Sequence, residues 1–83
     1  MSVVSKKTQE VADQIRVARK TKKVTQLELA AAIGIDRSSL AKMELGKMEF
    51  TLGRVLAIVE FLNIDPASLF LNLNDNITEG KNG

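Results

Sequence analysis

Apolar residues recur at helical spacing through most of the chain. Between about Thr8 and Lys20, the residues Val11, Ile15 and Ala18 follow the 3.6-residue period and predict one face of an amphipathic helix. The same period returns in four later segments. Their expected inward positions are Leu29, Ala30 and Ile33; Leu40 and Met43; Leu52, Val55, Leu56, Val59 and Leu62; and Leu69 with Phe70. The pattern predicts five helices with short connections, which makes an all-α domain.

Residues with helix-capping chemistry stand at the ends of these segments. Thr25 followed by Glu28 has the spacing of a capping box at the start of the second helix, and Gly34 is suited to end it in a left-handed conformation. Asp36 is expected to cap the third helix, and Gly46 to close it. Thr51 precedes the fourth helix, and Asp65-Pro66 begins the fifth. We expect a flexible segment at 1–7, a folded domain at 8–73 and a disordered polar tail at 74–83.

Composition narrows the function classes. The chain of 83 residues has no cysteine and no histidine, so we expect no disulfide, no metal site and no cofactor, and no enzyme that depends on these residues. Glycine-rich phosphate loops are missing as well, so catalysis is not expected. No apolar run is long enough to span a membrane, and the first residues lack a signal-peptide core. We expect a cytoplasmic protein without membrane contact.

Charge is distributed unevenly along the chain. Residues 1–47 carry ten Lys and Arg against five Asp and Glu, whereas residues 48–83 carry two against five. A basic half is suited to a phosphate backbone, and an acidic half is repelled by it. The first half is therefore expected to face nucleic acid, although solvated surface charge is the alternative explanation.

The third predicted helix, 36–46, places polar residues opposite Leu40 and Met43. Its outward positions, predicted to read bases, are Arg37, Ser38, Ala41 and Lys42. Arginine can donate two hydrogen bonds to guanine O6 and N7, lysine can donate to guanine, and an alanine methyl can contact the methyl group of thymine. The second and third helices then form a helix-turn-helix with the third in the major groove. An ordinary solvated helix face satisfies the same pattern.

Several neighbouring side chains are suited to phosphates. Gln26 begins the second helix, where unpaired backbone N–H groups favour an anion. Arg19 can pair with Glu44 if the first and third helices pack together, and its guanidinium is then expected to touch a phosphate as well. The other candidate phosphate contacts are Lys20, Lys22, Lys23, Ser39 and Lys47. For the lysines, a solvated charge is the alternative.

From Ile15 to about Phe70 the chain resembles the lambda-repressor-like, XRE-type helix-turn-helix family. The shared blocks are Thr25-Gln26-Leu27-Glu28-Leu29-Ala30, Gly34-Ile35 and Leu40-Ala41-Lys42-Met43-Glu44-Leu45-Gly46. The resemblance implies a compact five-helix fold and a transcriptional regulator that binds a palindromic operator as a two-fold dimer. It also implies that Gln26 contacts a phosphate and that Arg19 pairs with Glu44. The loop 47–50 departs from the family pattern, since Glu49 is acidic.

Surplus apolar residues suggest a homodimer interface. The candidates are Ile58, Phe61, Leu69, Leu71 and Leu73, and ordinary core is the alternative for each. The preferred function is a homodimeric, sequence-specific regulator that binds double-stranded DNA and resembles restriction-modification controller proteins and small phage repressors. The second hypothesis is an antitoxin that binds a toxin and autoregulates its operon, because the second half is acidic and 69–73 could extend as a strand. RNA polymerase is a further partner to consider, and we expect a bacterial or phage-encoded, nucleoid-associated protein.

Overall fold

The computed structural model describes residues 6–69 of the chain. Within them, α1 spans Lys6–Thr21, α2 spans Gln26–Ile33, α3 spans Arg37–Glu44 and α4 spans Leu52–Leu62. Residues 66–69 form one further helical turn, and no strand occurs in this range. The expected all-α, five-helix fold is confirmed. α1 begins at Lys6, so residues 6 and 7 of the segment expected to be flexible are helical, and residues 1–5 lie outside the described residues.

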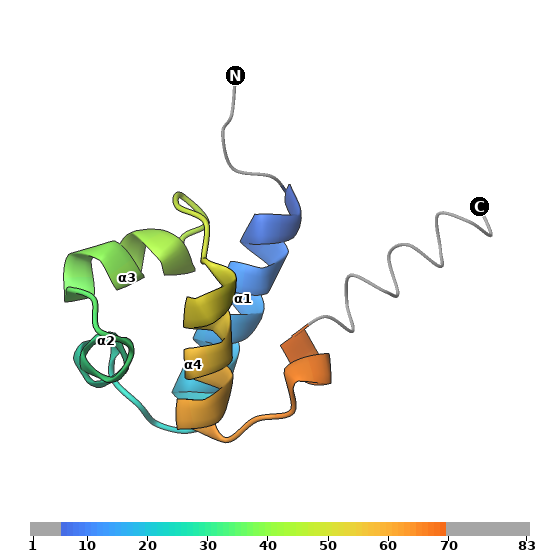
Figure 1. The fold of residues 1–83 in the computed structure, drawn as a ribbon. Coiled ribbons are helices and arrows are strands. Elements are labelled where there is room, and N and C mark those ends of the chain that lie inside the picture. Colours follow the sequence, from blue (N-terminus) through green and yellow to red (C-terminus); the bar gives the residue numbers. More distant parts are fainter. Residues whose placement is uncertain (1–5, 70–83) are drawn as a thin grey trace.

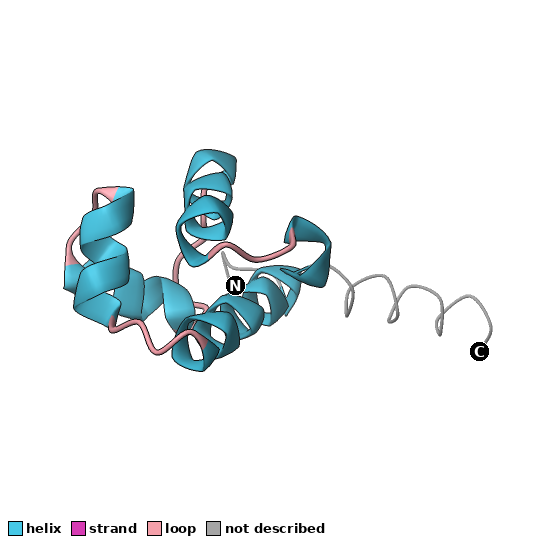
Figure 2. Ribbon diagram, turned by 90° about the horizontal axis from the view of Figure 1, so that it is seen from below, coloured by secondary structure: helices cyan, strands magenta, loops and turns pink. Residues whose placement is uncertain are grey.

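The helices separate into two sides (Figure 1). α2 and α3 lie on one side of α1 and α4, and the turn at 66–69 lies on the other; Figure 2 shows the same separation from below. α2 packs against both α3 and α4, while α1 supports α3 and α4. The helix-turn-helix is therefore held from behind by α1 and α4, and one side of α3 stays uncovered.

The helix starts follow the capping residues of the sequence. The Thr25 side chain accepts from the Glu28 backbone N–H at 3.0 Å, and the Glu28 carboxylate accepts from the Thr25 backbone N–H at 2.8 Å, which completes the capping box. Asp36 and Thr51 accept from the backbone N–H three residues later, at the starts of α3 and α4. The local sequence thus specifies where each of these helices begins.

All four long helices end in the same way. A residue with positive φ follows the helix, and the next N–H reaches back five residues, for example from Ile35 to the Ala30 carbonyl at 3.0 Å. This is the Schellman arrangement. The residues with positive φ are Lys23, Gly34, Gly46 and Asn63. Only Lys23 lacks the local chemistry that tolerates this conformation, so its position costs free energy that a glycine there would avoid.

The core lies where α1, α2, α3 and α4 meet. Its fully buried side chains include Ile15, Leu29, Leu40 and Ile58. These residues come from four different helices, so one cluster of aliphatic side chains fixes the position of each helix relative to the others. Leu40 and Met43 lie in this core and so fix the position of α3.

α4 buries only part of the side that was expected to face inward. Val55, Ile58 and Leu62 are buried, whereas Leu52 is 72% exposed and Leu56 is 55% exposed. Apolar residues surround most of α4, so the period alone fits more than one orientation. The contact with α2 decides between them.

Two of the candidate interface residues are core residues. Ile58 is fully buried, and Leu69 from the turn at 66–69 is only 1% exposed and joins the same cluster. Neither can contact another chain while this fold is intact, so the prediction of an interface role was wrong for both. Phe61 remains exposed. Leu71 and Leu73 lie outside the described residues.

In the described part of the chain, every helix is too short or too polar to cross a membrane.

Candidate nucleic-acid interface

The uncovered side of α3 carries the residues predicted to read bases. Leu40 and Met43 bury the opposite side of the helix. Arg37, Ser38 and Lys42 are exposed, and Ala41 is half-buried. A small residue at positions 38 and 41 lets the helix backbone come close to a surface, and the two cations give it positive charge. Small residues beside cationic donors are the combination found on helices that enter a major groove.

Arg37 is held by Gln26 from the start of α2. Its Nη1 donates to Gln26 Oε1 at 3.0 Å, and Gln26 Nε2 donates to Glu44 Oε1 at 3.1 Å. Arg37 offers only donors and the Glu44 carboxylate only acceptors, so a single orientation of the Gln26 amide serves both. Gln26 therefore holds the guanidinium at the end of the Arg37 side chain, and this bond uses only one of its five N–H groups.

The network ends in a buried ion pair. Arg19 Nε donates to Glu44 Oε2 at 2.7 Å, and Arg19 Nη2 donates to Glu44 Oε1 at 3.0 Å. Its third nitrogen, Nη1, donates to the Val24 carbonyl at 2.8 Å. Arg19 is 7% exposed and Glu44 is 2% exposed. The expected pair is present, and three of the five guanidinium N–H groups donate inside the protein, so little of the Arg19 side chain is exposed for the phosphate contact that was predicted.

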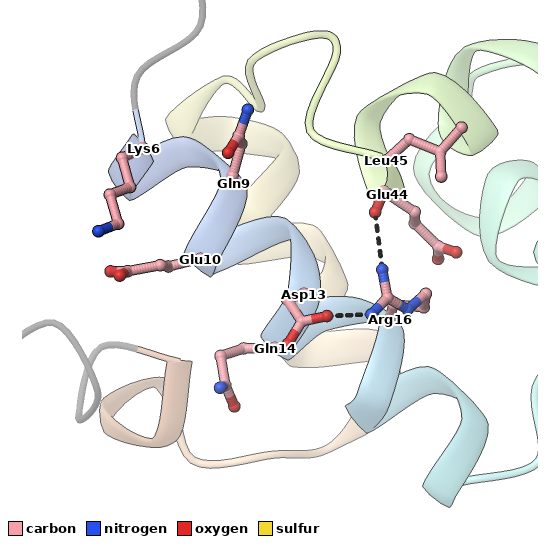
Figure 3. Close-up of a pocket in the computed structure, with 8 residues that line it drawn as sticks. All are labelled: Lys6, Gln9, Glu10, Asp13, Gln14, Arg16, Glu44 and Leu45. Carbon is pink, nitrogen blue, oxygen red and sulfur yellow. Dashed lines mark hydrogen bonds and ion pairs between the residues drawn. The ribbon is translucent and has the colours of Figure 1, made fainter.

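Arg16 has a role that the sequence reasoning missed. Arg16 Nη1 donates to the main-chain carbonyl of Glu44 at 3.2 Å, and the same guanidinium pairs with Asp13. Figure 3 shows this contact at the edge of a groove of about 590 Å³ between α1 and the end of α3. A cation at the last carbonyls of a helix stabilises its negative end. Arg16 thus ties the C-terminal end of α3 to α1.

The caps beside the face carry negative charge. Hydrogen bonds from the Ser39 side chain and backbone lower the pKa of Asp36 below its ordinary value of 3.8. The backbone N–H of Thr25 similarly lowers the pKa of Glu28 below 4.5. Both carboxylates are therefore ionised at neutral pH. The Ser39 hydroxyl is engaged with Asp36 at 2.7 Å, which leaves it poorly placed as the phosphate donor that was predicted.

The predicted lysines are on the surface. Lys20, Lys22, Lys23 and Lys47 are all exposed. Lys22 and Lys23 lie in the connection that leads directly into α2, and Lys47 follows the end of α3. Their positions at the two ends of the helix-turn-helix agree with a cationic border around α3. Leu45 also lies exposed at the end of α3, and no role was assigned to it from the sequence.

Comparisons with known proteins agree with this geometry. A family profile described as Helix-turn-helix matches residues 15–69. The uncharacterized HTH-type transcriptional regulator y4dL of Sinorhizobium fredii is 34% identical over 59 residues, which cover 71% of this chain and 30% of that protein. The chain therefore spans less than a third of the length of this curated relative.

Two solved structures are similar. The restriction-modification controller protein C.AhdI from Aeromonas hydrophila is 30% identical, with a TM-score of 0.70 over 76% of this chain and 96% of that chain. The clp gene regulator ClgR from Corynebacterium glutamicum is 19% identical, with a TM-score of 0.79 over 93% of this chain and 82% of that chain. The second likeness concerns the fold alone.

Proposed function

The chain belongs to the helix-turn-helix family of DNA-binding transcriptional regulators, and from this premise we propose that it acts as a homodimer on a palindromic operator. In this proposal α3 lies in the major groove of double-stranded DNA. Arg37, Ser38, Ala41 and Lys42 read base edges, while Gln26 and the exposed lysines contact phosphates. The relatives are named as regulators, and the proposal includes no catalytic step.

The observation that carries the proposal is the connection between the buried pair and the exposed face. Glu44 binds Arg19 on one side and Gln26 on the other, and Gln26 binds Arg37. A solvated helix face needs no such support. Holding a base-reading side chain in place before binding reduces the ordering cost of association. The network therefore favours a reading role for α3 over an ordinary polar surface.

A pair of variants tests the two kinds of contact. Arg37→Ala should weaken binding to the selected site by about 1–3 kcal/mol, or roughly 5- to 150-fold, and relax base preference at one position. Lys22→Ala should weaken binding to all sequences alike and lower the slope of log affinity against log salt by about one. Fluorescence anisotropy on the selected and on a scrambled duplex measures both effects.

Two outcomes would contradict the assignment. If Arg37→Ala lowers binding to both duplexes equally, Arg37 contacts the backbone and does not read bases. If affinity for the duplex is independent of salt, the cationic border has no part in binding.

The homodimer rests on exposed apolar residues of α4. Leu52 and Leu56 lie one turn apart on this helix and are exposed, and Phe61 is exposed near its end. An apolar groove of about 290 Å³ beside Leu52 is lined by Val11, Phe50 and Val55, among others. In a chain of this size such surface commonly marks an interface. A side chain from a second copy could occupy this groove.

Sedimentation velocity on Leu56→Lys tests the dimer. We expect the variant to dissociate at concentrations where the unmodified protein is dimeric. Leu27→Lys is the matched control, since Leu27 is 65% exposed on α2 and outside the proposed interface. Equal behaviour of the two variants would remove α4 from the interface. The structure adds no support for the antitoxin alternative: Leu69 is helical and buried, which does not fit the strand expected at 69–73, and residues 70–73 lie outside the described residues.

A further inference from the structure

Arg54 lies at the start of α4 and has no partner for its charge. The chain has four arginines, and the guanidinium groups of Arg16, Arg19 and Arg37 all donate to acceptors within the protein. Among residues 6–69, the Arg54 side chain makes no hydrogen bond and joins neither ion pair. Arg54 is nevertheless half-buried. A charge that is partly removed from water without a partner costs free energy, which an anion beside it would offset.

The Arg54 side chain lines a groove beside α3. The groove has a volume of about 400 Å³, and its other lining residues include Ile35, Asp36, Ser39, Met43 and Met48. The two methionines offer apolar surface to the stem of Arg54, while its charged end can stay in solvent. Asp36 lines the same groove, but its two carboxylate oxygens accept from Ser39 and form no ion pair with Arg54. The guanidinium therefore stays available to an anion from outside the protein.

Arg54 and Gln26 lie on different sides of α3. Gln26, at the start of α2, hydrogen-bonds to Arg37 on one flank of the helix. Ser39 and Met43, which line the groove of Arg54, stand on the other flank, and the outward residues predicted to read bases lie between the two flanks. A helix in the major groove has one sugar-phosphate strand on each side. The start of α2 is therefore expected to face one strand and the start of α4 the other.

The loop between α3 and α4 adds no net charge on the α4 side. Lys47 and Glu49 are both exposed in this loop, and their charges cancel. On the other side of α3, by contrast, Lys22 and Lys23 lead directly into α2. A phosphate on the α4 side therefore needs a cation from beyond the loop, and Arg54 is the next cation in the chain. Its planar guanidinium can donate two parallel N–H bonds to one phosphate.

We propose that Arg54 binds a phosphate of the DNA strand opposite the strand contacted by Lys22 in the same half-site. This inference rests on the proposed function, because it requires α3 in the major groove. Contacts to both strands hold α3 between them and so fix its orientation in the groove. Phosphate contacts of this kind position a protein on the duplex and carry no sequence information of their own. Loss of the Arg54 contact should therefore weaken binding to all sequences alike.

Uncharged phosphates test the assignment one position at a time. In the duplex enriched from a random pool, each phosphate of one half-site is replaced in turn by a methylphosphonate, and fluorescence anisotropy measures the affinity of the full chain. At a contacted phosphate we expect the unmodified protein to lose roughly 10-fold in affinity. Arg54→Met, which keeps an apolar stem, should lose nothing further at one phosphate. Lys22→Met is the matched control with the same change in charge, and it should lose nothing further at a phosphate of the other strand.

The dependence on salt gives a second readout. Arg54→Met should lower the slope of log affinity against log salt by about one. Arg54→Lys keeps the charge, so it should retain the slope of the unmodified protein even where the loss of the planar fork lowers its affinity. A reduced slope in Arg54→Lys would contradict the inference.

The remaining outcomes separate the ways in which the inference can fail. If no duplex is enriched, the proposed function itself fails. If a duplex is enriched and Arg54→Met keeps the affinity and salt slope of the unmodified protein, Arg54 does not bind a phosphate. If Arg54→Met and Lys22→Met are insensitive at phosphates of the same strand, the assignment to opposite strands is wrong. If Arg54→Met is less stable in urea but binds DNA unchanged once folded, Arg54 has a structural role only.

Discussion

Glu44→Ala is expected to remove a large part of the stability of the fold. The substitution leaves the Arg19 guanidinium buried without its carboxylate, and it also releases the Gln26 amide. Breaking a buried pair by removing one partner costs about 3–5 kcal/mol. The total stability of a chain of 83 residues is of the order of 4–12 kcal/mol. The loss is therefore a large fraction of the total, and the single variant should unfold at a clearly lower temperature and urea concentration than the unmodified protein.

Replacing both partners removes the ion pair without leaving an unpaired charge in the core. In Arg19→Met/Glu44→Leu no buried charge is left, and apolar side chains of similar volume occupy the space. Such replacements are often neutral or stabilising, so we expect the double variant to be at least 2 kcal/mol more stable than Glu44→Ala. Urea unfolding followed by circular dichroism at 222 nm measures the free energy of unfolding of each protein.

The double variant also isolates the contribution of Glu44 to DNA reading. It should fold, but Gln26 loses its anchor, so Arg37 should be less ordered and base preference at its position should weaken. Equal stability of Glu44→Ala and the unmodified protein would refute the reasoning about the pair. A folded double variant with unchanged base preference would refute the role of the network in holding Arg37.

Gly46→Ala should lower the free energy of unfolding by about 1 kcal/mol more than Gly34→Ala does. Both glycines have φ near +77°, but only at Gly46 would a Cβ meet a neighbour, the Gln9 Cγ at 2.7 Å. Urea unfolding of the two variants measures the difference. Lys23→Gly should stabilise the fold by about 0.5–1 kcal/mol, since φ is +60° there, and a lower melting temperature would contradict this. The lowered pKa values of Glu28 and Asp36 give stability that is complete above their ordinary values of 4.5 and 3.8 and is lost as pH falls through the folded values. Glu28→Gln/Asp36→Asn should therefore show a shallower loss of stability on acidification below pH 4.5 than the unmodified protein.

The helix starts could be predicted from the sequence because their causes are local. Thr25 with Glu28, Asp36 and Thr51 each meet a backbone N–H three residues away, and that contact depends on nothing else in the fold. The same holds for the left-handed conformation at Gly34. Lys23 adopts this conformation without a local signal, so the sequence did not indicate it.

The failures concern features that depend on packing between helices. The period of α4 admitted several orientations, and its contact with α2 selected the one that buries Ile58. The resemblance indicated the Arg19–Glu44 pair, but whether Arg19 could still reach a phosphate depended on how deeply α1 and α3 bury it.

Selection of bound duplexes from a random pool tests the central claim most directly. The proposal predicts an enriched palindrome whose two half-sites are centred about one helical turn apart, roughly 34 Å, as two recognition helices related by a two-fold axis require. Arg37→Ala should return the same spacing with one relaxed position in each half-site. A pool that shows no enrichment over its starting composition would contradict sequence-specific binding, and enrichment of a single half-site without symmetry would contradict the dimer.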